Sequence, residues 1–183
     1  MSDKGRLYIV ATPIGNLKDF TFRAIDTLKE VDFVFAEDTR NSIQLMKHYN
    51  IETKIDSYHE HNSVKKTPKI INLLNEGSNI ALISDAGTPT ISDPGYKLIR
   101  ACIDEKIDIV PIPGASAVTT ALSASGLPSD SFFFLGFLPH KKGRKKKISF
   151  LKSLDNTIII FESPHRLLKT LKELHDELGE RPI

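Results

Sequence analysis

Residues 84–95 are rich in the residue types that build a small-molecule site. They read Ser-Asp-Ala-Gly-Thr-Pro-Thr-Ile-Ser-Asp-Pro-Gly. Glycine and alanine let a ligand approach the backbone closely, and two prolines hold the segment in shape, so less entropy is lost on binding. This composition favours a preformed pocket for a small organic molecule.

A second segment of this kind reads Pro-Gly-Ala-Ser-Ala at residues 113–117. Its Pro113-Gly114 pair predicts a type II turn, followed by a helix that begins near Ser116. The small residues in and after the turn are equally compatible with tight helix packing. Taken alone, this segment leaves both a ligand role and a packing role open.

A third segment, residues 12–16, reads Thr-Pro-Ile-Gly-Asn and lacks the known nucleotide motifs. It has neither the glycine spacing of a dinucleotide-binding fingerprint nor the lysine of a Walker loop. This argues against a dinucleotide and against ATP hydrolysis. An ordinary strand-to-helix turn is an equal alternative to a ligand site.

Charged residues follow another apolar run at Glu37-Asp38-Thr39-Arg40. Two carboxylates and a guanidinium in this position could bind ribose hydroxyls or orient a phosphate. The alternative is a capped helix start, in which Asp38 or Thr39 accepts a hydrogen bond from a backbone N–H.

Two alternate histidines, His59 and His61, flank Glu60. On an extended segment they share a face, so a metal site is conceivable, but a third ligand at suitable spacing is absent. We therefore expect no metal. A solvated loop or an RNA contact is the better interpretation.

The basic residues are concentrated in one place. Residues 141–147 read Lys-Lys-Gly-Arg-Lys-Lys-Lys, although the formal net charge of the whole chain is only +2. Such a run suits the phosphate backbone of a nucleic acid. A solvated loop and helix start is the alternative.

The composition is that of a soluble globular chain, with 183 residues of which 40% are hydrophobic and 26% charged. Cys102 is the only cysteine, which excludes an intrachain disulfide and fits a reducing compartment. No apolar run approaches the ~18 residues of a membrane helix, and the first residues do not resemble a signal sequence. We expect a cytoplasmic protein with no membrane partner.

Short apolar runs alternate with segments of helical period, which predicts an α/β fold with a parallel sheet. The expected strands are residues 7–11, 33–36, 54–57, 79–84, 107–112, 132–137 and 157–161. The expected helices are residues 21–30, 42–49, 66–75, 96–105, 117–125, 145–151 and 166–178. Asp93-Pro94 has the form of a helix cap followed by proline at the first helical position. Because ligands bind beyond the carboxyl ends of parallel strands, we expect the glycine- and proline-rich segments to converge at one edge of the sheet.

Gly126-Leu-Pro is the strongest internal breaker, since it separates a helix of small residues from an aromatic strand. We therefore expect an N-terminal α/β domain at residues 1–125 and a second, smaller α/β domain at residues 126–183. The alternation of elements calls for a further strand where the chain stops, so we expect this second domain to be incomplete.

Seven motifs follow one another over nearly the whole chain. They are Val10-Ala-Thr-Pro-Ile-Gly-Asn-Leu, Ala36-Glu-Asp-Thr-Arg, Ser57-Tyr-His-Glu-His-Asn, residues 84–95, Pro113-Gly-Ala-Ser-Ala, Gly136-Phe-Leu-Pro and Phe161-Glu-Ser-Pro-His-Arg. In order and spacing they resemble the tetrapyrrole-methylase superfamily, the class III methyltransferases with two α/β domains. Within it, the match is closest to the branch of ribosomal RNA small subunit methyltransferases.

The resemblance implies transfer of a methyl group from S-adenosylmethionine to the 2′-hydroxyl of a cytidine in 16S ribosomal RNA, on the assembled small subunit. It also implies a homodimer. The cofactor-binding residues expected by motif are Pro13, Asp85, Ala86, Gly87, Thr88, Ile91, Ser116 and Ala117, with Phe161 or Glu162 from the second domain. The expected RNA-binding residues are Lys141, Lys142, Arg144, Lys145, Lys146 and Lys147.

A proton acceptor would help a ribose hydroxyl, which is a poor nucleophile, to attack a methyl group. The candidates are Asp38, Glu37, Asp85 and His59. Asp38 is the first choice, with Arg40 placed to orient this carboxylate or to contact a phosphate.

Two other functions stay open. A corrin or porphyrin C-methyltransferase would share the fold, but those members open with a Gly-Pro-Gly-Asp pattern where this chain has Pro13-Ile-Gly-Asn16. This difference and the lysine run argue against a macrocycle. A non-catalytic RNA-binding module would have no need of a preformed pocket.

Overall fold

The computed structural model describes residues 4–183, and the chain divides into two compact units. The first unit is Met1–Ala117 and the second is Val118–Ile183. Each unit is an arrangement of parallel strands and helices, and each is described separately below.

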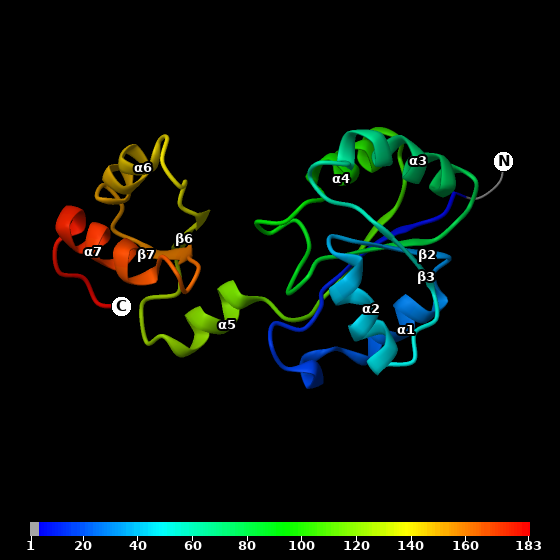
Figure 1. Ribbon diagram of the computed structural model, residues 1–183, viewed down its shortest axis with the longest axis horizontal. Coiled ribbons are helices and arrows are strands. Elements are labelled where there is room, and N and C mark those ends of the chain that lie inside the picture. The colour runs from blue at the N-terminus through cyan, green and yellow to red at the C-terminus, as the bar shows by residue number, and fades with distance from the viewer. Residues whose placement is uncertain (1–3) are drawn as a thin grey trace. The chain divides into compact units, whose positions relative to one another are not determined.

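A five-stranded sheet with strand order β3-β2-β4-β1-β5 forms the centre of the first unit (Figure 1). The strands are β1 (Leu7–Val10), β2 (Phe33–Ala36), β3 (Lys54–Ser57), β4 (Ile80–Ile83) and β5 (Ile109–Ile112). Every neighbouring pair is parallel. All five carboxyl ends therefore lie along one edge, and the predicted α/β fold with a parallel sheet is confirmed.

Helices cover both faces of this sheet, and each face has its own core (Figure 1). The helices are α1 (Phe22–Glu30), α2 (Thr39–His48), α3 (Ser63–Asn75) and α4 (Tyr96–Asp104). Val10 packs with Leu28 of α1 on one face, whereas Leu7 packs with Leu74 of α3 on the other. This division follows from the alternation of side chains along a strand. Burying each such leucine contributes about 1.5–3 kcal/mol.

The predicted helices and strands are all present, and the differences lie at their ends. α2 begins at Thr39, before the predicted Ser42, because the Asp38 carboxylate accepts a hydrogen bond from the backbone N–H of Arg40 and caps the helix. A short 3-10 helix, η1 (Leu17–Asp19), follows β1 and was not predicted.

The start of α4 also differs from the prediction. The capping position is Gly95, with a φ of 140°, and not Asp93. A Cβ on Gly95 would lie 2.6 Å from Cγ2 of Thr90 and 3.0 Å from Cδ2 of Leu82. Only glycine fits this position, so the helix starts after it and Asp93 belongs to the loop that follows β4.

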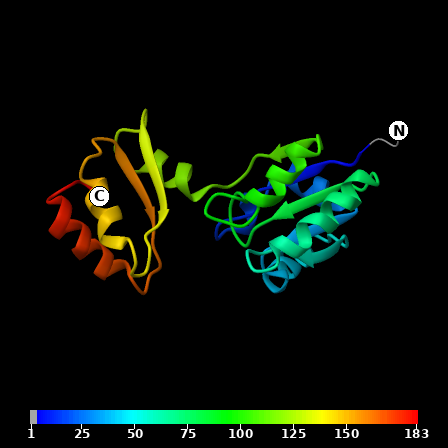
Figure 2. The same cartoon turned by 90° about the horizontal axis from the view of Figure 1, so that it is seen from above.

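The second unit contains two parallel strands and the helices that follow them. The elements are α5 (Ala117–Ala124), β6 (Phe132–Phe137), α6 (Arg144–Leu151), β7 (Thr157–Phe161) and α7 (Leu167–Leu178). β6 pairs with β7, with an irregularity between Phe134 and Gly136. α6 and α7 lie side by side (Figure 2).

The division between the units falls after Ala117, whereas the sequence places a boundary near Gly126. α5 therefore belongs almost wholly to the second unit. The physical reason is its packing, because Ala121 and Leu122 of α5 line the same hollow as Leu151 of α6.

Candidate functional site

Three loops of the first unit meet at the carboxyl edge of its sheet, those that follow β1, β4 and β5. The backbone N–H of Thr12 donates to the carbonyl of Gly87 (2.9 Å), and that of Gly87 donates to the carbonyl of Thr12 (3.0 Å). The buried hydroxyl of Thr12 donates to the carbonyl of Ser84 (3.1 Å). The hydroxyl of Thr88 donates to the carbonyl of Ala115 (3.2 Å) and joins the third loop to the other two. The expected convergence of these segments is therefore present.

Close packing between the loops after β1 and β5 explains the presence of Gly114. A Cβ at this position would lie 2.8 Å from the Cβ of Ala11, well inside the ordinary contact distance of two carbons. Gly114 does not have the positive φ that the second central residue of a type II turn requires, so the predicted turn type is wrong. Glycine is needed at this position because the two loops approach each other too closely for a Cβ.

The loop after β4 has an uncommon backbone conformation. Thr90 and Ser92 have φ angles of 74° and 65°, and Gly87 has a φ of 81°. Such angles cost a residue with a Cβ about 1–3 kcal/mol and persist only where surrounding contacts impose them. Because strain of this kind is concentrated at ligand-binding and catalytic sites, it supports the interpretation of residues 84–95 as a binding loop.

Seven of the predicted cofactor-binding residues lie on these three loops, and an eighth, Ala117, begins α5 directly after the third loop. These eight residues differ in exposure. Asp85, Ala86, Ile91 and Ala117 are exposed, Thr88 and Ser116 are half-buried, and Pro13 and Gly87 are buried. The edge therefore offers backbone groups, small side chains and one larger apolar side chain. A site for a small organic ligand typically combines apolar surface with a few polar groups in this way.

Phe161, the remaining predicted cofactor-binding residue, lies at the end of β7 in the second unit. Its ring packs edge-to-face against Phe134 and Phe137, with ring centroids 4.9 and 5.5 Å apart. Its neighbour Glu162 is part of a hydrogen-bonded network in the same unit. Contact of either residue with a cofactor stays a prediction.

Asp38 and Arg40 form an ion pair after β2. The Asp38 carboxylate accepts hydrogen bonds from Nε (3.0 Å) and Nη2 (2.5 Å) of Arg40. These bonds lower the pKa of Asp38 to about 2. A carboxylate with so low a pKa is a weak proton acceptor, so the geometry favours the helix-capping role that the sequence left open. The side chain of Arg40 is 87% exposed and remains accessible to an anion.

Asp85 connects the loop after β4 to the start of α2. Its carboxylate accepts hydrogen bonds from the backbone N–H of Asp38 (3.1 Å) and from the side-chain amide of Asn41 (3.2 Å). The connection is possible because β2 and β4 are neighbours in the sheet. The loop after β2 therefore belongs to the same cluster as the other three.

The surroundings of Glu37 shift its pKa in the opposite direction from that of Asp38. Burial raises the pKa of Glu37, and the charges of Asp93, Asp85 and Asp38 raise it further. A carboxylate with a raised pKa binds a proton more readily. Glu37 is therefore a better proton acceptor than Asp38, a ranking that the sequence could not provide.

His59, the last candidate for a proton acceptor, follows β3. Its backbone N–H donates to the side-chain oxygen of Asn62 (2.9 Å), and its ring centroid lies 6.1 Å from that of His61. Its buried Nδ1 has no hydrogen-bond partner within residues 4–183. β3 is an edge strand, and β2 separates it from β4. The topology therefore favours Glu37 over His59 for chemistry at the converging loops.

The second unit carries the basic segment, on the loop after β6 and the first turn of α6. The exposed cations are Lys141, Lys142, Lys145, Lys146 and Lys147. Gly143 occupies the capping position of α6, no side chain caps the helix, and its first turn contains no acidic residue. Cations at this end oppose the helix dipole, and a bound anion would relieve the unfavourable interaction.

Arg144 differs from these lysines. Its side chain is only 11% exposed. Its guanidinium donates to Glu173 (2.7 Å), to Thr170 (2.6 Å) and to the carbonyl of Pro139 (3.2 Å). The predicted RNA contact conflicts with this position, because all three nitrogens are engaged inside the unit. The sequence pattern missed Thr170 and Glu173, which belong to α7 and carry no motif.

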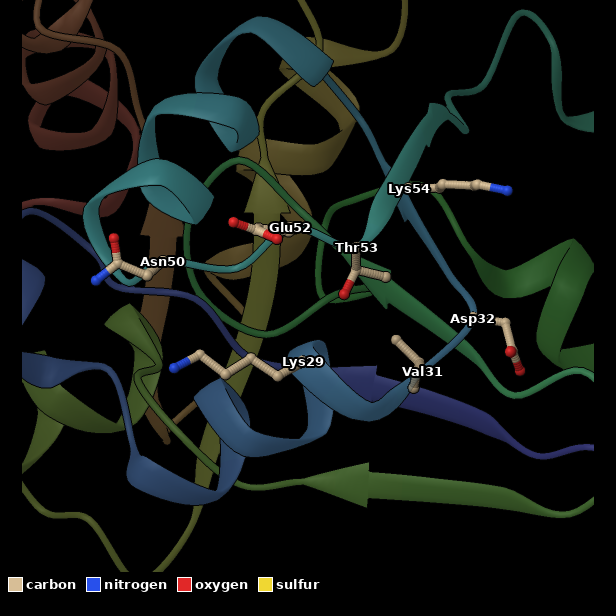
Figure 3. Close-up of a pocket in the computed structure, with 7 residues that line it drawn as sticks. All are labelled: Lys29, Val31, Asp32, Asn50, Glu52, Thr53 and Lys54. Carbon is tan, nitrogen blue, oxygen red and sulfur yellow. The ribbon is translucent and has the colours of Figure 1, made fainter.

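A small open pocket at the other edge of the first sheet is not part of this site (Figure 3). Its lining residues are Lys29, Val31, Asp32, Asn50, Glu52, Thr53 and Lys54. Asp32 directly precedes β2 and Lys54 begins β3, so the pocket adjoins the amino ends of the strands. None of the predicted site residues lines it.

Within residues 4–183, no group of three or more histidine, cysteine, aspartate or glutamate side chains is arranged to hold a metal ion. None of the helices described there combines the length and apolar character needed to cross a bilayer.

The sequence matches known proteins over nearly its whole length. The profile of the family described as Tetrapyrrole (Corrin/Porphyrin) Methylases matches residues 6–183. A protein of Halalkalibacterium halodurans named ribosomal RNA small subunit methyltransferase I is 55% identical over 99% of this chain. The protein of the same name from Bacillus subtilis is 54% identical over 100% of this chain. The chain spans 63% of the length of each of these relatives.

Solved structures share the fold at much lower identity. Diphthine synthase gives a TM-score of 0.71 at 15% identity, over 92% of this chain and 72% of that one. Uroporphyrin III C-methyl transferase from Thermus thermophilus gives a TM-score of 0.64 at 17% identity, over 97% of this chain and 79% of that one. At such identities the likeness concerns the fold alone.

Proposed function

The chain belongs to the tetrapyrrole (corrin/porphyrin) methylase family, and from this membership we propose that it acts in the methylation of ribosomal RNA. The proposed reaction transfers a methyl group from S-adenosylmethionine to the 2′-hydroxyl of a cytidine in 16S ribosomal RNA of the small subunit. The observation that carries the proposal is the 55% identity, over 99% of this chain, to a relative named for small-subunit ribosomal RNA. A homodimer in the cytoplasm is part of the same proposal.

The converging loops of the first unit are the proposed cofactor site. S-adenosylmethionine would supply a methyl group that its sulfonium already activates. The loops fit such a ligand, because the small residue Ala86 is exposed and the side chain of Ile91 is 43% exposed. The residues of the first unit proposed to hold the cofactor are Pro13, Asp85, Ala86, Gly87, Thr88, Ile91, Ser116 and Ala117.

The residues after β2 are proposed to handle the ribose. Glu37 would accept the proton of the 2′-hydroxyl, since its raised pKa suits this task better than that of Asp38. Asp38 would orient Arg40, whose exposed guanidinium would bind a substrate phosphate. Holding the ribose oxygen about 3 Å from the methyl group and in line with it would supply much of the rate.

The exposed lysines of the second unit are proposed to bind the RNA backbone. Lys141, Lys142 and residues 145–147 lie on one short segment without an acidic residue among them. Each lysine that meets a phosphate releases a counterion, so affinity should fall steeply with salt. Arg144 is left out of this contact set because its nitrogens are engaged within the unit.

Methyl transfer to small subunits that lack the modification tests the proposed function. With methyl-tritiated S-adenosylmethionine, we expect label in the RNA and a linkage at that cytidine that resists alkaline cleavage. The Bacillus subtilis relative is the positive control. Label in a porphyrin or corrin would favour C-methylation instead. Calorimetry that detects no binding of S-adenosylmethionine, together with intact RNA binding, would favour a non-catalytic module.

A further inference from the structure

A polar network lies behind the basic segment and joins α6, α7 and the loops after β6 and β7. Arg144, the first residue of α6, donates through three different nitrogens to Glu173, to Thr170 and to the carbonyl of Pro139. Thr170 is 2% exposed. A planar guanidinium can serve three acceptors in fixed directions at once, which a lysine ammonium cannot do in the same geometry.

Glu162, directly after β7, is the second centre of this network. Its side chain is 5% exposed and accepts hydrogen bonds from the Thr170 hydroxyl (2.7 Å) and the Ser163 backbone N–H (2.8 Å). It also forms an ion pair with Arg166 (2.6 Å), whose guanidinium lies 3.1 Å from Nδ1 of His140. The loops after β6 and β7 are therefore tied together.

The network holds the first turn of α6 in place. Thr170 accepts a hydrogen bond from Arg144 and donates one to Glu162, so it links the two centres. Residues 145–147 follow Arg144 directly, and the direction in which their side chains leave the helix depends on how that turn is held. Lysine side chains lose rotamer entropy on binding, and a fixed helix start lowers the further cost of aligning them with phosphates.

We propose that Arg144 is a positioning residue for RNA binding: it does not contact RNA, and Glu162, Thr170 and Glu173 hold it so that the exposed lysines of residues 141–147 face one run of phosphates. The inference rests on the proposed RNA-binding function. In this proposal Glu162 and Glu173 favour the binding of RNA, an anion, whereas their negative charge alone would disfavour it.

Arg144→Lys tests the inference because it keeps the charge and removes the three-way hydrogen bonding. We expect weaker binding to a fluorescent hairpin of small-subunit ribosomal RNA. The slope of log affinity against log salt should become smaller by about 1–2, as one or two phosphates are no longer neutralised by lysine. Arg100→Lys, at an arginine of α4 that pairs with Asp104 in the first unit, is the matched control and should keep the slope. Unfolding of part of the sample would lower the active fraction and not the slope, so the slope separates positioning from mere structural support.

Glu173→Gln gives the sharper contrast, since removal of an acid should by charge alone tighten RNA binding. If Glu173 helps to position Arg144, Glu173→Gln should bind the RNA hairpin more weakly and show a smaller slope of log affinity against log salt. Asp176→Asn removes an exposed acid from the same helix without a contact to Arg144, and we expect equal or slightly tighter binding. Tighter binding by Glu173→Gln, with an unchanged slope for Arg144→Lys, would overturn the inference and leave the proposed function standing. Absence of salt-dependent RNA binding by the unaltered protein would overturn both.

Discussion

Carboxylates that the sequence could not rank have distinct surroundings at the carboxyl edge of the first sheet. Asp38 accepts hydrogen bonds from Arg40, and these lower its pKa. Burial and neighbouring charges raise that of Glu37. Asp85 accepts hydrogen bonds that join two loops. The difference in chemistry comes from neighbours supplied by other strands and loops, so it follows from the fold.

Glu37→Gln tests the proposed proton acceptor. Glu37 must be ionised to accept a proton, so methyl transfer by the unaltered protein should fall as the pH drops through its pKa, which lies above the ordinary 4.5. We expect the variant to be about 10²–10⁴-fold slower and to lose this pH dependence. The rate of transfer to small subunits is measured between pH 5 and 9. Glu52→Gln, at the amino edge of the sheet, is the control, and an unaltered pH profile in Glu37→Gln would exclude the role.

Asp38→Asn tests the ion pair with Arg40. The pKa of Asp38 is about 2 in the folded protein against an ordinary 3.8, so its ionised form stabilises the fold above that ordinary value. This stabilisation is lost as the pH falls from about 4 towards 2. Because asparagine can still cap α2, the variant isolates the charge. Urea unfolding should show a stability difference at pH 6 that disappears near pH 2; a difference independent of pH would contradict the assignment.

At the scale of the elements, apolar periodicity predicted every strand and α-helix of residues 4–183, because burial on a sheet or helix face is a local pattern in the sequence. It failed where a distant neighbour decides the conformation. Gly95 rather than Asp93 precedes α4, because Thr90 and Leu82 leave no room for a Cβ. In the sequence Arg144 cannot be told from its lysine neighbours, because its partners Thr170 and Glu173 lie on the distant α7. The loops of the candidate site were predictable by motif, whereas the roles of their charged residues were not.

Gly114→Ala tests the contact between the loops after β1 and β5. The added Cβ would approach that of Ala11 to 2.8 Å, so one loop must shift. We expect a loss of about 1–3 kcal/mol in unfolding free energy, as for other overpacked sites, and weaker binding of S-adenosylmethionine by calorimetry. Adding Ala11→Gly to the variant should restore most of both. Full cofactor affinity in Gly114→Ala alone would mean that this contact does not shape the site.

Replacing Lys145, Lys146 and Lys147 with alanine tests the first turn of α6 as an RNA contact. Affinity for the ribosomal RNA hairpin should fall, and the salt slope should shrink by about 0.7–0.9 for each phosphate that lysine no longer neutralises. Affinity for S-adenosylmethionine should stay the same. The matched control replaces Lys29, Lys54 and Lys106 of the first unit with alanine, which removes an equal charge. Equal losses of affinity in the two triple variants would show that only net charge matters.

At the scale of the whole molecule, each unit carries a different part of the proposed function. The first holds the converging loops and the second holds the exposed lysines. The family profile matches residues 6–183, so both units take part in the match. Together they cover 63% of the length of the relative from Halalkalibacterium halodurans. Cofactor binding and RNA binding can therefore be measured separately in variants of one unit at a time.

Cys102 provides a probe for the opening of the first unit. It is the only cysteine, its side chain is 0% exposed, and burial raises the pKa of its thiol to about 11. The folded protein should react very slowly with iodoacetamide at pH 8. S-adenosylmethionine at a hundred times its Kd should slow labelling about a hundredfold where labelling requires unfolding. Where labelling requires unfolding, an unchanged rate would mean that the cofactor does not bind the folded first unit.

The order of strands in the first sheet also has a consequence for synthesis on the ribosome. β1 is made first, but it pairs only with β4 and β5, and Leu7 lies beside Ile80 and Ile109. At roughly 5–20 residues per second, this apolar strand waits several seconds for its partners to be translated. During that interval the nascent chain exposes an unpaired strand, so a chaperone that shields Leu7–Val10 would protect the yield of the folded protein.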